Sequence, residues 1–352
     1  MTAVASSISL RLNRTAVVLT ALAVAVVLLT VLGIALGPVR VPLLDTARIL
    51  VGAQPSDARW QVIVHGLRLP RVLTAIAAGA GLGVAGLQMQ TLFRNSLADP
   101  YVLGVSSGAG LGVAVVVIAT GSGFTAGLTN DRIGVTVAAA VGAAAVLAVV
   151  LTLAQWVRSP ATLLLIGVMV SAATTAVVSV LLVYADPLRV QQYLMWGLGS
   201  FAGTTWGDLR LMLPVVVAGV AAAAFTLRAL NALLLGENYA RTMGIDVRRA
   251  RLITLASASL LTGATTALCG PIAFLGLAVP HLTRLALGTS DHRAVLPTAV
   301  LMGSAIALAC GIVSQVPGSD AVLPVNAVTA LIGAPIVVAV LVRSRRGLGM
   351  PQ

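Results

Sequence analysis

Long apolar runs recur along the whole chain, and each is about as long as a membrane is thick. The runs cover residues 15–37, 69–92, 103–120, 133–157, 161–184, 209–227, 250–270, 272–287, 295–316 and 325–342. A helix needs about 20 mostly apolar residues to cross the hydrocarbon core of a bilayer. The runs therefore predict an all-α polytopic membrane protein, with about ten transmembrane helices in a compact bundle.

The composition leaves little room for anything else. Hydrophobic residues make up 59% of the 352 residues and charged residues only 9%, whereas a soluble domain of this size needs far more charge on its surface. We expect one membrane domain over residues 1–352 and no soluble catalytic domain. The first run is too long for the core of a secretion signal, so it is expected to be the first membrane helix.

The basic residues interrupt the apolar runs instead of gathering on one face. The formal net charge is +12, and the chain contains no lysine. This distribution argues against a nucleic-acid partner and follows the positive-inside rule. It predicts that both termini, residues 1–14 and 343–352, lie in the cytoplasm. Cys269 and Cys310 lie in or beside apolar runs and are expected to pack between helices, without forming a disulfide or a metal site.

The apolar runs carry two further signals. Gly104, Gly108 and Gly112 recur every four residues, as do Gly79 and Gly83, and such small faces let membrane helices approach closely. No charged residue lies deep in a run, whereas ion-coupled carriers usually keep one there. A secondary carrier is therefore the weaker alternative. An integral-membrane enzyme is weaker still, since only Asp291 and His292 suggest a reactive cluster.

The most polar segment on the predicted cytoplasmic side covers residues 228–251. Glu237 and Arg241 stand four residues apart, which suits a helical ion pair. Gly244 can adopt the left-handed conformation that ends a helix, and Ala240 and Met243 can lie on its apolar side. A short amphipathic helix of this kind suits a groove on a partner. The alternative is a solvated loop whose arginines anchor the next span.

Several separate blocks together resemble a known family. They are residues 67–73, 94–100, 103–109, 195–200, 235–245, 270–284, 291–293 and 329–335. In this order they resemble the FecCD permeases of ATP-binding-cassette (ABC) importers for iron siderophores, haem and cobalamin, and thus imply the type II importer permease fold. The resemblance implies a bacterial cytoplasmic-membrane protein that moves an iron chelate, a ferric siderophore on the breadth of the family, with haem or cobalamin as alternatives.

The resemblance also implies the partners. These are two cytoplasmic ATP-binding subunits, a second copy of the permease or a paralogous one, an extracytoplasmic substrate-binding protein and membrane lipid. The chain itself has no Gly-x-x-x-x-Gly-Lys-Ser/Thr phosphate loop, and without lysine it cannot have one. We therefore expect no enzyme activity and no cofactor in this chain, with ATP and Mg²⁺ bound by the partner.

The resemblance assigns roles to particular residues. The coupling segment that presses on the ATPase comprises Leu235, Gly236, Glu237, Ala240, Arg241, Met243 and Gly244. Arg68 and Arg71 correspond to arginines that dock the binding protein, the alternative being cationic anchors at the head of a helix. A cytoplasmic gate falls on Ser159, Pro160, Ala161 and Thr162. Weakly interacting walls of the pathway fall on Ser171, Thr174, Thr175 and Ser179.

The chain departs from the family pattern at four positions. Val322 replaces an acidic residue, Asn326 and Ala273 replace glycines, and Gln315 stands where the cobalamin permease has an arginine.

The three histidines are not expected to bind haem. We expect His281 to pair with the backbone carbonyl that Pro280 leaves free, instead of ligating a metal. His65 and His292 are expected to be solvated.

Overall fold

The computed structural model describes residues 2–37, 39, 41–119, 132–157, 159–315 and 322–347. Within those residues the chain is helical, and its one extended feature is an isolated bridge between Gln315 and Val322. Ten helices match the ten apolar runs, so the all-α prediction is confirmed. They are α1 (Thr2–Ala35), α4 (Leu69–Leu92), α5 (Val105–Ala119), α6 (Arg132–Trp156), α7 (Pro160–Val183), α9 (Trp206–Phe225), α12 (Val247–Cys269), α13 (Leu275–Leu287), α14 (His292–Ser314) and α15 (Val325–Gly347).

The lengths of these helices suit a membrane. In the described part of the chain, seven helices are long and apolar enough to cross one, and apolar stretches of α5, α13 and α15 are shorter. The expected short helix is α13, which contains Pro280. Helix α1 begins well before its apolar run because the run defines the part that suits lipid, and polar residues can continue a helix beyond it.

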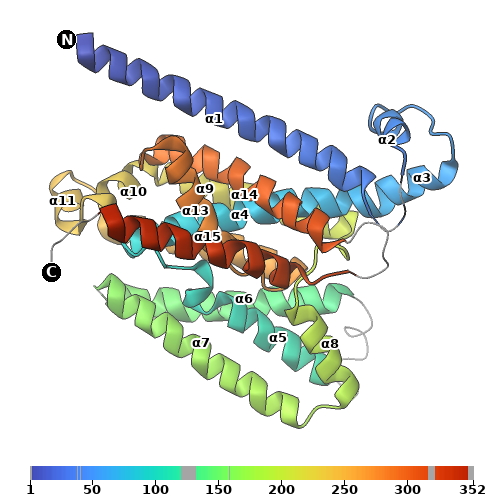
Figure 1. Cartoon of the computed structure of the whole chain (residues 1–352). Helices are drawn as coiled ribbons and strands as arrows, with labels where there is room; N and C mark the ends of the chain where they lie inside the picture. Colours follow the sequence, from blue (N-terminus) through green and yellow to red (C-terminus); the bar gives the residue numbers. More distant parts are fainter. Residues whose placement is uncertain are drawn as a thin grey trace.

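Short helices lie at the two ends of the bundle. They are α2 (Leu43–Leu50), α3 (Ala58–Ile63), η1 (Val64–Arg68), η2 (Pro100–Leu103), α8 (Pro187–Gly197), α10 (Leu227–Leu234) and α11 (Glu237–Thr242). Helices α10 and α11 lie at the end where α1 begins and α15 stops, and α2, α3 and α8 lie at the opposite end (Figure 1). We call these the α11 end and the α3 end. Only α11 was predicted, because the other short helices are too short to produce a distinct apolar run.

Helix α4 is the centre of the bundle. It is buried along nearly its whole length and packs against α9, α12, α13 and α14. The glycines make this closeness possible: a Cβ on Gly83 would lie 2.8 Å from Val279 Cγ1, and one on Gly79 would overlap the backbone of Gly303. The predicted glycine face of this helix is confirmed, and the absence of side chains is what lets the backbones touch.

A second glycine contact joins α5 to α6. Gly108 and Gly112 of α5 face Gly142 and Ala138 of α6 so closely that a Cβ would overlap backbone atoms. The prediction that Gly104 shares this helical face is wrong. Gly104 ends η2 in the left-handed conformation at φ +82° and precedes α5, so the spacing of four continues across a turn and not along one helix.

Helix α7 contrasts with α4, because most of its apolar side chains are exposed in the single chain. Leu165 is 57% exposed, Val177 50% and Val183 78%. An apolar helix this exposed needs lipid or another protein chain against it. In Figure 1, α7 lies at the edge of the bundle, far from α1.

Candidate functional site

Helix α11 is a short helix set between two glycines. Gly236 precedes it at φ +115° and Gly244 follows it at φ +77°, so the predicted left-handed stop at Gly244 is confirmed. Arg241 Nη2 lies 3.5 Å from Glu237 Oε2, which confirms the predicted ion pair. A positive φ favours glycine because a Cβ would crowd the backbone. Both turns are therefore built from the one residue type that forms them without strain.

The apolar side chains of this segment divide into two sets. Ala240 is fully buried against the rest of the chain, whereas Met243 is 59% exposed, so the expectation that the two share one side of the helix is wrong. Leu235 and Tyr239 are also exposed, at 64% and 50%. Tyr239 within α11, with Leu235 before it and Met243 after it, forms an exposed apolar surface that a partner can cover.

An ion pair that local spacing could not reveal ties α11 to α12. Arg251 pairs through Nη2 with Glu237 and donates from Nη1 to the carbonyl of Val157 at 3.1 Å, at the end of α6. Arg248, Arg241 and Arg251 line a hollow of about 330 Å³ beside this contact. The result is an open, cationic depression directly beside α11.

A cluster of polar side chains joins α10 to α14 and α4. Asn231 of α10 accepts from the backbone N–H of His292 at 2.9 Å and donates to Asp291 Oδ1 at 2.7 Å. The ring of His292 lies 2.7 Å from Asn231 Oδ1 through Nδ1 and 2.8 Å from Thr91 Oγ1 through Nε2. His292 is fully buried, so the prediction that it is solvated is wrong. Its position at the start of a helix suggested a loop, and only the packing of α10 over it encloses the ring.

Three more hydrogen bonds hold the same end of α4 and the loop that follows it. Arg284 of α13 donates to Gln90 Oε1 at 2.8 Å, and Gln90 Nε2 donates to the carbonyl of Leu277 at 3.1 Å. The His281 ring bonds the carbonyl of Ser96, at 2.9 Å, in the loop after α4. The expected partner, a carbonyl freed inside its own helix by Pro280, was therefore wrong, although the predicted bond to a backbone carbonyl is present.

The two candidate docking arginines lie at the α3 end and point inward. Arg68 is 4% exposed and donates to the carbonyls of Ile34 at 2.6 Å and Ala35 at 2.8 Å, and also to that of Val39. Arg71 donates to the carbonyl of Gly33 at 3.3 Å. The last carbonyls of a helix have no partner within the helix and attract cations. The two guanidinium groups therefore occupy the C-terminal end of α1, and a docking role for them stays a prediction.

The loop between α2 and α3 is closed by a carboxylate. Asp45 accepts from the backbone N–H of Ser56 at 3.0 Å and from its hydroxyl at 2.5 Å, and it lies 3.5 Å from Arg48 Nη1. The bonds from Ser56 lower the pKa of Asp45 below its usual value, because they stabilise the ionised carboxylate. This side-chain contact holds the loop at neutral pH.

The predicted gate residues begin α7. Ser159 is the N-cap, its hydroxyl accepting from Thr162 N at 3.4 Å, and Pro160 stands in the first turn, where a missing N–H costs nothing. These contacts account for the start of the helix. The role of this segment as a gate stays a prediction.

Two of the four predicted wall residues face a polar cavity of about 320 Å³. Its lining comes from η2, α5, α7 and α8 and includes Tyr101, Ser106, Ser107, Ser171, Thr175, Tyr193 and Trp196. Thr174 and Ser179 instead bond carbonyls of their own helix, Val170 at 2.7 Å and Thr175 at 3.0 Å. The described lining carries hydroxyls and aromatic rings and no charged side chain. The role of Ser171, Thr174, Thr175 and Ser179 as walls of a pathway stays a prediction.

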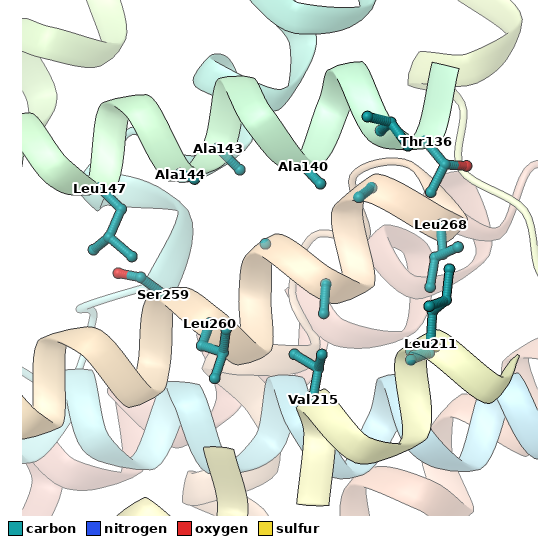
Figure 2. A pocket seen from close by; sticks show the side chains of 15 residues that line it. Thr136, Ala140, Ala143, Ala144, Leu147, Leu211, Val215, Ser259, Leu260 and Leu268 are labelled. Carbon is teal, nitrogen blue, oxygen red and sulfur yellow. The ribbon is translucent and has the colours of Figure 1, made fainter. Parts of the chain in front are cut away.

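A different cavity, of about 270 Å³, lies between α6, α9 and α12 (Figure 2). Figure 2 shows Leu147, Leu211, Val215 and Leu260 around it, and Ser259 and Thr136 supply its few polar atoms. Such a wall suits hydrocarbon and offers nothing to a polar cargo. We therefore place the candidate pathway at the α7–α8 cavity and not here.

The four departures from the family pattern form two contacting pairs. Asn326 Oδ1 accepts from the backbone N–H of Ala273 at 3.1 Å. Gln315 and Val322 form the isolated bridge. The Asn326 contact joins residues 53 positions apart through a side chain that glycine lacks. The Gln315–Val322 bridge is a backbone contact between residues close in the sequence.

Comparisons with known proteins agree with this geometry. The model of the FecCD transport family matches residues 14–343. The chain is 36% identical over 304 residues to the hemin transport system permease protein HmuU of Yersinia pestis, covering 85% of this chain and 88% of that one. It is 40% identical over 277 residues to the cobalamin import system permease protein BtuC of Halobacterium salinarum, covering 78% and 72%. A solved inward-facing structure of a metal-chelate type ABC transporter superposes with a TM-score of 0.79 at 29% identity, over 94% of this chain and 99% of that chain.

Proposed function

The chain belongs to the FecCD transport family, and from that premise we propose that it forms the membrane pathway for a ferric siderophore in an ATP-driven importer. The observation that carries the proposal is the exposed apolar surface of α11, Leu235, Tyr239 and Met243, held between two glycine turns beside a cationic hollow. A helix that is fixed to its own bundle and still offers an uncovered face suits a partner that pushes on it.

The proposed orientation of the chain in the membrane follows from the exposed apolar surface at α11. We place the α11 end, with both termini, in the cytoplasm, where two ATP-binding subunits supply ATP and Mg²⁺. The chain itself contributes no catalytic residue and no cofactor site. A second permease, a copy or a paralogue, covers α7, whose exposed apolar side chains support this pairing. The polar cavity between α7 and α8 then opens toward the pathway, with the gate at residues 159–162.

The α3 end faces the substrate-binding protein in this arrangement. Arg68 is buried, and three of its five N–H donors are bound by backbone carbonyls, so it offers little to a partner surface. We propose that Arg68 and Arg71 favour docking through their positive field, which acts over about 8–10 Å at physiological salt. Arg59 on α3, with its side chain 82% exposed, is available for direct contact.

Haem and cobalamin are the second candidates for cargo, because HmuU and BtuC are named for hemin and cobalamin transport. The uncharged lining of the α7–α8 cavity does not choose among these chelates.

The test is uptake into vesicles that hold the permease, its ATPase and its binding protein. We expect ATP-dependent uptake of a ferric siderophore and no ATP hydrolysis by the permease alone. Uptake of haem or cobalamin in its place would change the cargo and keep the function. Uptake that continues without any ATPase subunit would overturn the proposal and favour a secondary carrier.

A further inference from the structure

We propose that the side-chain amide of Asn231 transmits movement of α11 to the central helix α4, through its hydrogen bonds to Asp291 and His292. We call this set of hydrogen bonds the joint. The proposal rests on the proposed function, because it assumes that α11 is moved by an ATPase. Asn231, Asp291 and His292 are positioning residues in it, and none of them needs to touch cargo or nucleotide.

The joint lies immediately before α11 in the chain. Asn231 belongs to α10, and only Leu235 and Gly236 separate α10 from α11. The apolar side of α10 is buried, with Leu230 at 0% and Leu233 at 3% exposure, and α10 packs against both α4 and α14. A movement of α11 therefore reaches the bundle along the chain through α10, a helix that is packed against the core.

The hydrogen bonds of Asn231 allow one orientation of its amide. Oδ1 must be the atom that faces the backbone N–H of His292, because an N–H cannot accept from another N–H. The NH₂ group then faces Asp291 Oδ1, at 2.7 Å, and serves as its donor. Both polar atoms of the amide are used, so a rotation of α10 cannot occur without breaking bonds to the start of α14.

The same orientation sets the tautomer of His292. Nδ1 lies 2.7 Å from Asn231 Oδ1, which only accepts, so Nδ1 carries the proton. In the neutral ring Nε2 is then an acceptor. It lies 2.8 Å from Thr91 Oγ1, whose one hydroxyl proton is shared between Nε2 and the carbonyl of Leu87, also at 2.8 Å. Thr91 is in the last turn of α4. Directional bonds therefore run from α10 through the start of α14 to the central helix.

The second link of α11 to the bundle has a different character. Glu237 pairs with Arg251 of α12 and with Arg241, and the Arg241 side chain is 61% exposed. Ion pairs tolerate changes of angle and distance better than an amide that uses both of its polar atoms. We therefore assign the transmission of movement to the Asn231 contact, and the retention of α11 to the ion pairs.

Asn231→Asp tests the joint. It places a carboxylate against Asp291 and replaces a donor by an acceptor, while its other oxygen still accepts from His292. Asp291 stays unchanged in the test, because its Oδ1 accepts both from Asn231 Nδ2 and from the backbone N–H of Arg293, the bond that caps α14. Asp291→Asn could not turn that atom into a donor to residue 231 and also keep the cap.

The measurements use the full complex in vesicles. We expect Asn231→Asp to assemble normally and to keep its basal ATPase activity within about twofold, with uptake lowered about tenfold, the size expected for losing a charge-assisted bond. Thr91→Val removes the α4 side of the joint and should also lower uptake at normal abundance.

Asn95→Asp is the matched control, because it makes the same charge change at the same end of the molecule. Its oxygen still accepts from the backbone N–H of Leu97, as Asn95 does at 2.9 Å, so uptake should stay unchanged. Full uptake by Asn231→Asp would overturn the joint, and so would losses that follow permease abundance alone. If the original chain shows no ATP-dependent uptake, the proposed function fails and not the joint.

Discussion

The outer junction of α1 with α4 and the α10–α11 arm both depend on polar side chains, but they use different partners. At the outer junction, Arg68 binds backbone carbonyls at the end of α1. In the α10–α11 arm, Asn231 and Glu237 bind mainly other side chains, although Asn231 also accepts from the backbone N–H of His292. A bond to a backbone carbonyl ties two helices together for as long as they stay helical, whereas side-chain pairs can break and re-form. The first arrangement suits a fixed wall and the second suits a moving part.

Arg14 shows that α1 is also held through backbone carbonyls at the α11 end. The kind of partner therefore depends on the helix and not on the end of the molecule. Arg14 lies at the α11 end and donates to the carbonyls of Ala286 at 2.9 Å and Leu285 at 3.2 Å, at the close of α13. Helix α1 is therefore fastened near both ends by arginines that cap helices. We infer that α1 belongs to the fixed part of the bundle, and that α10 and α11 are the part that moves.

The largest effect on stability is expected when the junction between α1 and α4 is removed. Arg68→Ala leaves the buried carbonyls of Ile34 and Ala35 without this donor, and each buried unpaired group costs about 1–3 kcal/mol. We expect a loss of about 3 kcal/mol or more in the free energy of unfolding, measured by thermal denaturation in detergent. Arg59→Ala is the control, since its exposed side chain pairs only with Asp57 in the structure as described and should change little.

The contrast between a fixed junction and a moving arm would be contradicted if Arg68→Ala were as stable as the original chain and lost only affinity for the binding protein. That outcome would make Arg68 a docking residue and not a structural one. The same reasoning rules out a double change of Arg68 and Arg71 as a docking test, because unfolding would mask it. Arg71→Gln keeps a donor for the carbonyl of Gly33 and isolates the charge.

A smaller effect is expected in the moving part, from Gly244→Val. The residue has φ +77° in open space, so the cost is conformational, about 1–2 kcal/mol or more for a β-branched side chain. The strain falls outside the membrane helices. We expect normal permease abundance, lost uptake and ATPase activity that no longer responds to the loaded binding protein.

Gly244→Asn is the matched control for that change, because asparagine adopts the left-handed conformation at lower cost. It should retain most of the uptake. If Gly244→Val transports normally, the segment is a passive linker, and the division into fixed and moving parts no longer holds at this position.

The smallest effect concerns pH at the α3 end. The folded-state pKa of Asp45 is lowered, so its carboxylate stabilises the α2–α3 loop above the unfolded pKa of about 3.8, and this stability is lost as the pH falls through the folded value. We expect the protection factor of the Ser56 amide, which compares its exchange rate with the intrinsic rate at the same pH, to fall below about pH 4. Asp45→Asn should remove this pH dependence. An unchanged protection factor from about pH 6 down to about pH 2 in the original chain would contradict the assignment.

Most of the fold could be read from the sequence, because the bilayer imposes length and polarity on each span. The runs located α4 at residues 69–92, and the structure has it at Leu69–Leu92. The Glu237–Arg241 pair and the stop at Gly244 were also predictable, since both depend on neighbours within one helical turn. His292 was misjudged because local sequence gave it a helix start and nothing showed that α10 covers it.

The apolar runs by themselves determined that this chain is a bundle of membrane helices, since hydrophobic length is a property of each segment alone. They also determined where the short polar helix α11 interrupts that pattern. Only the tertiary structure decided what the polar side chains do. Arg68 is buried because α1 ends beside it, and Asn231 meets His292, 61 residues away, because α10 folds back over α14. Contacts of that kind depend on how helices pack, and no periodicity within a segment encodes them.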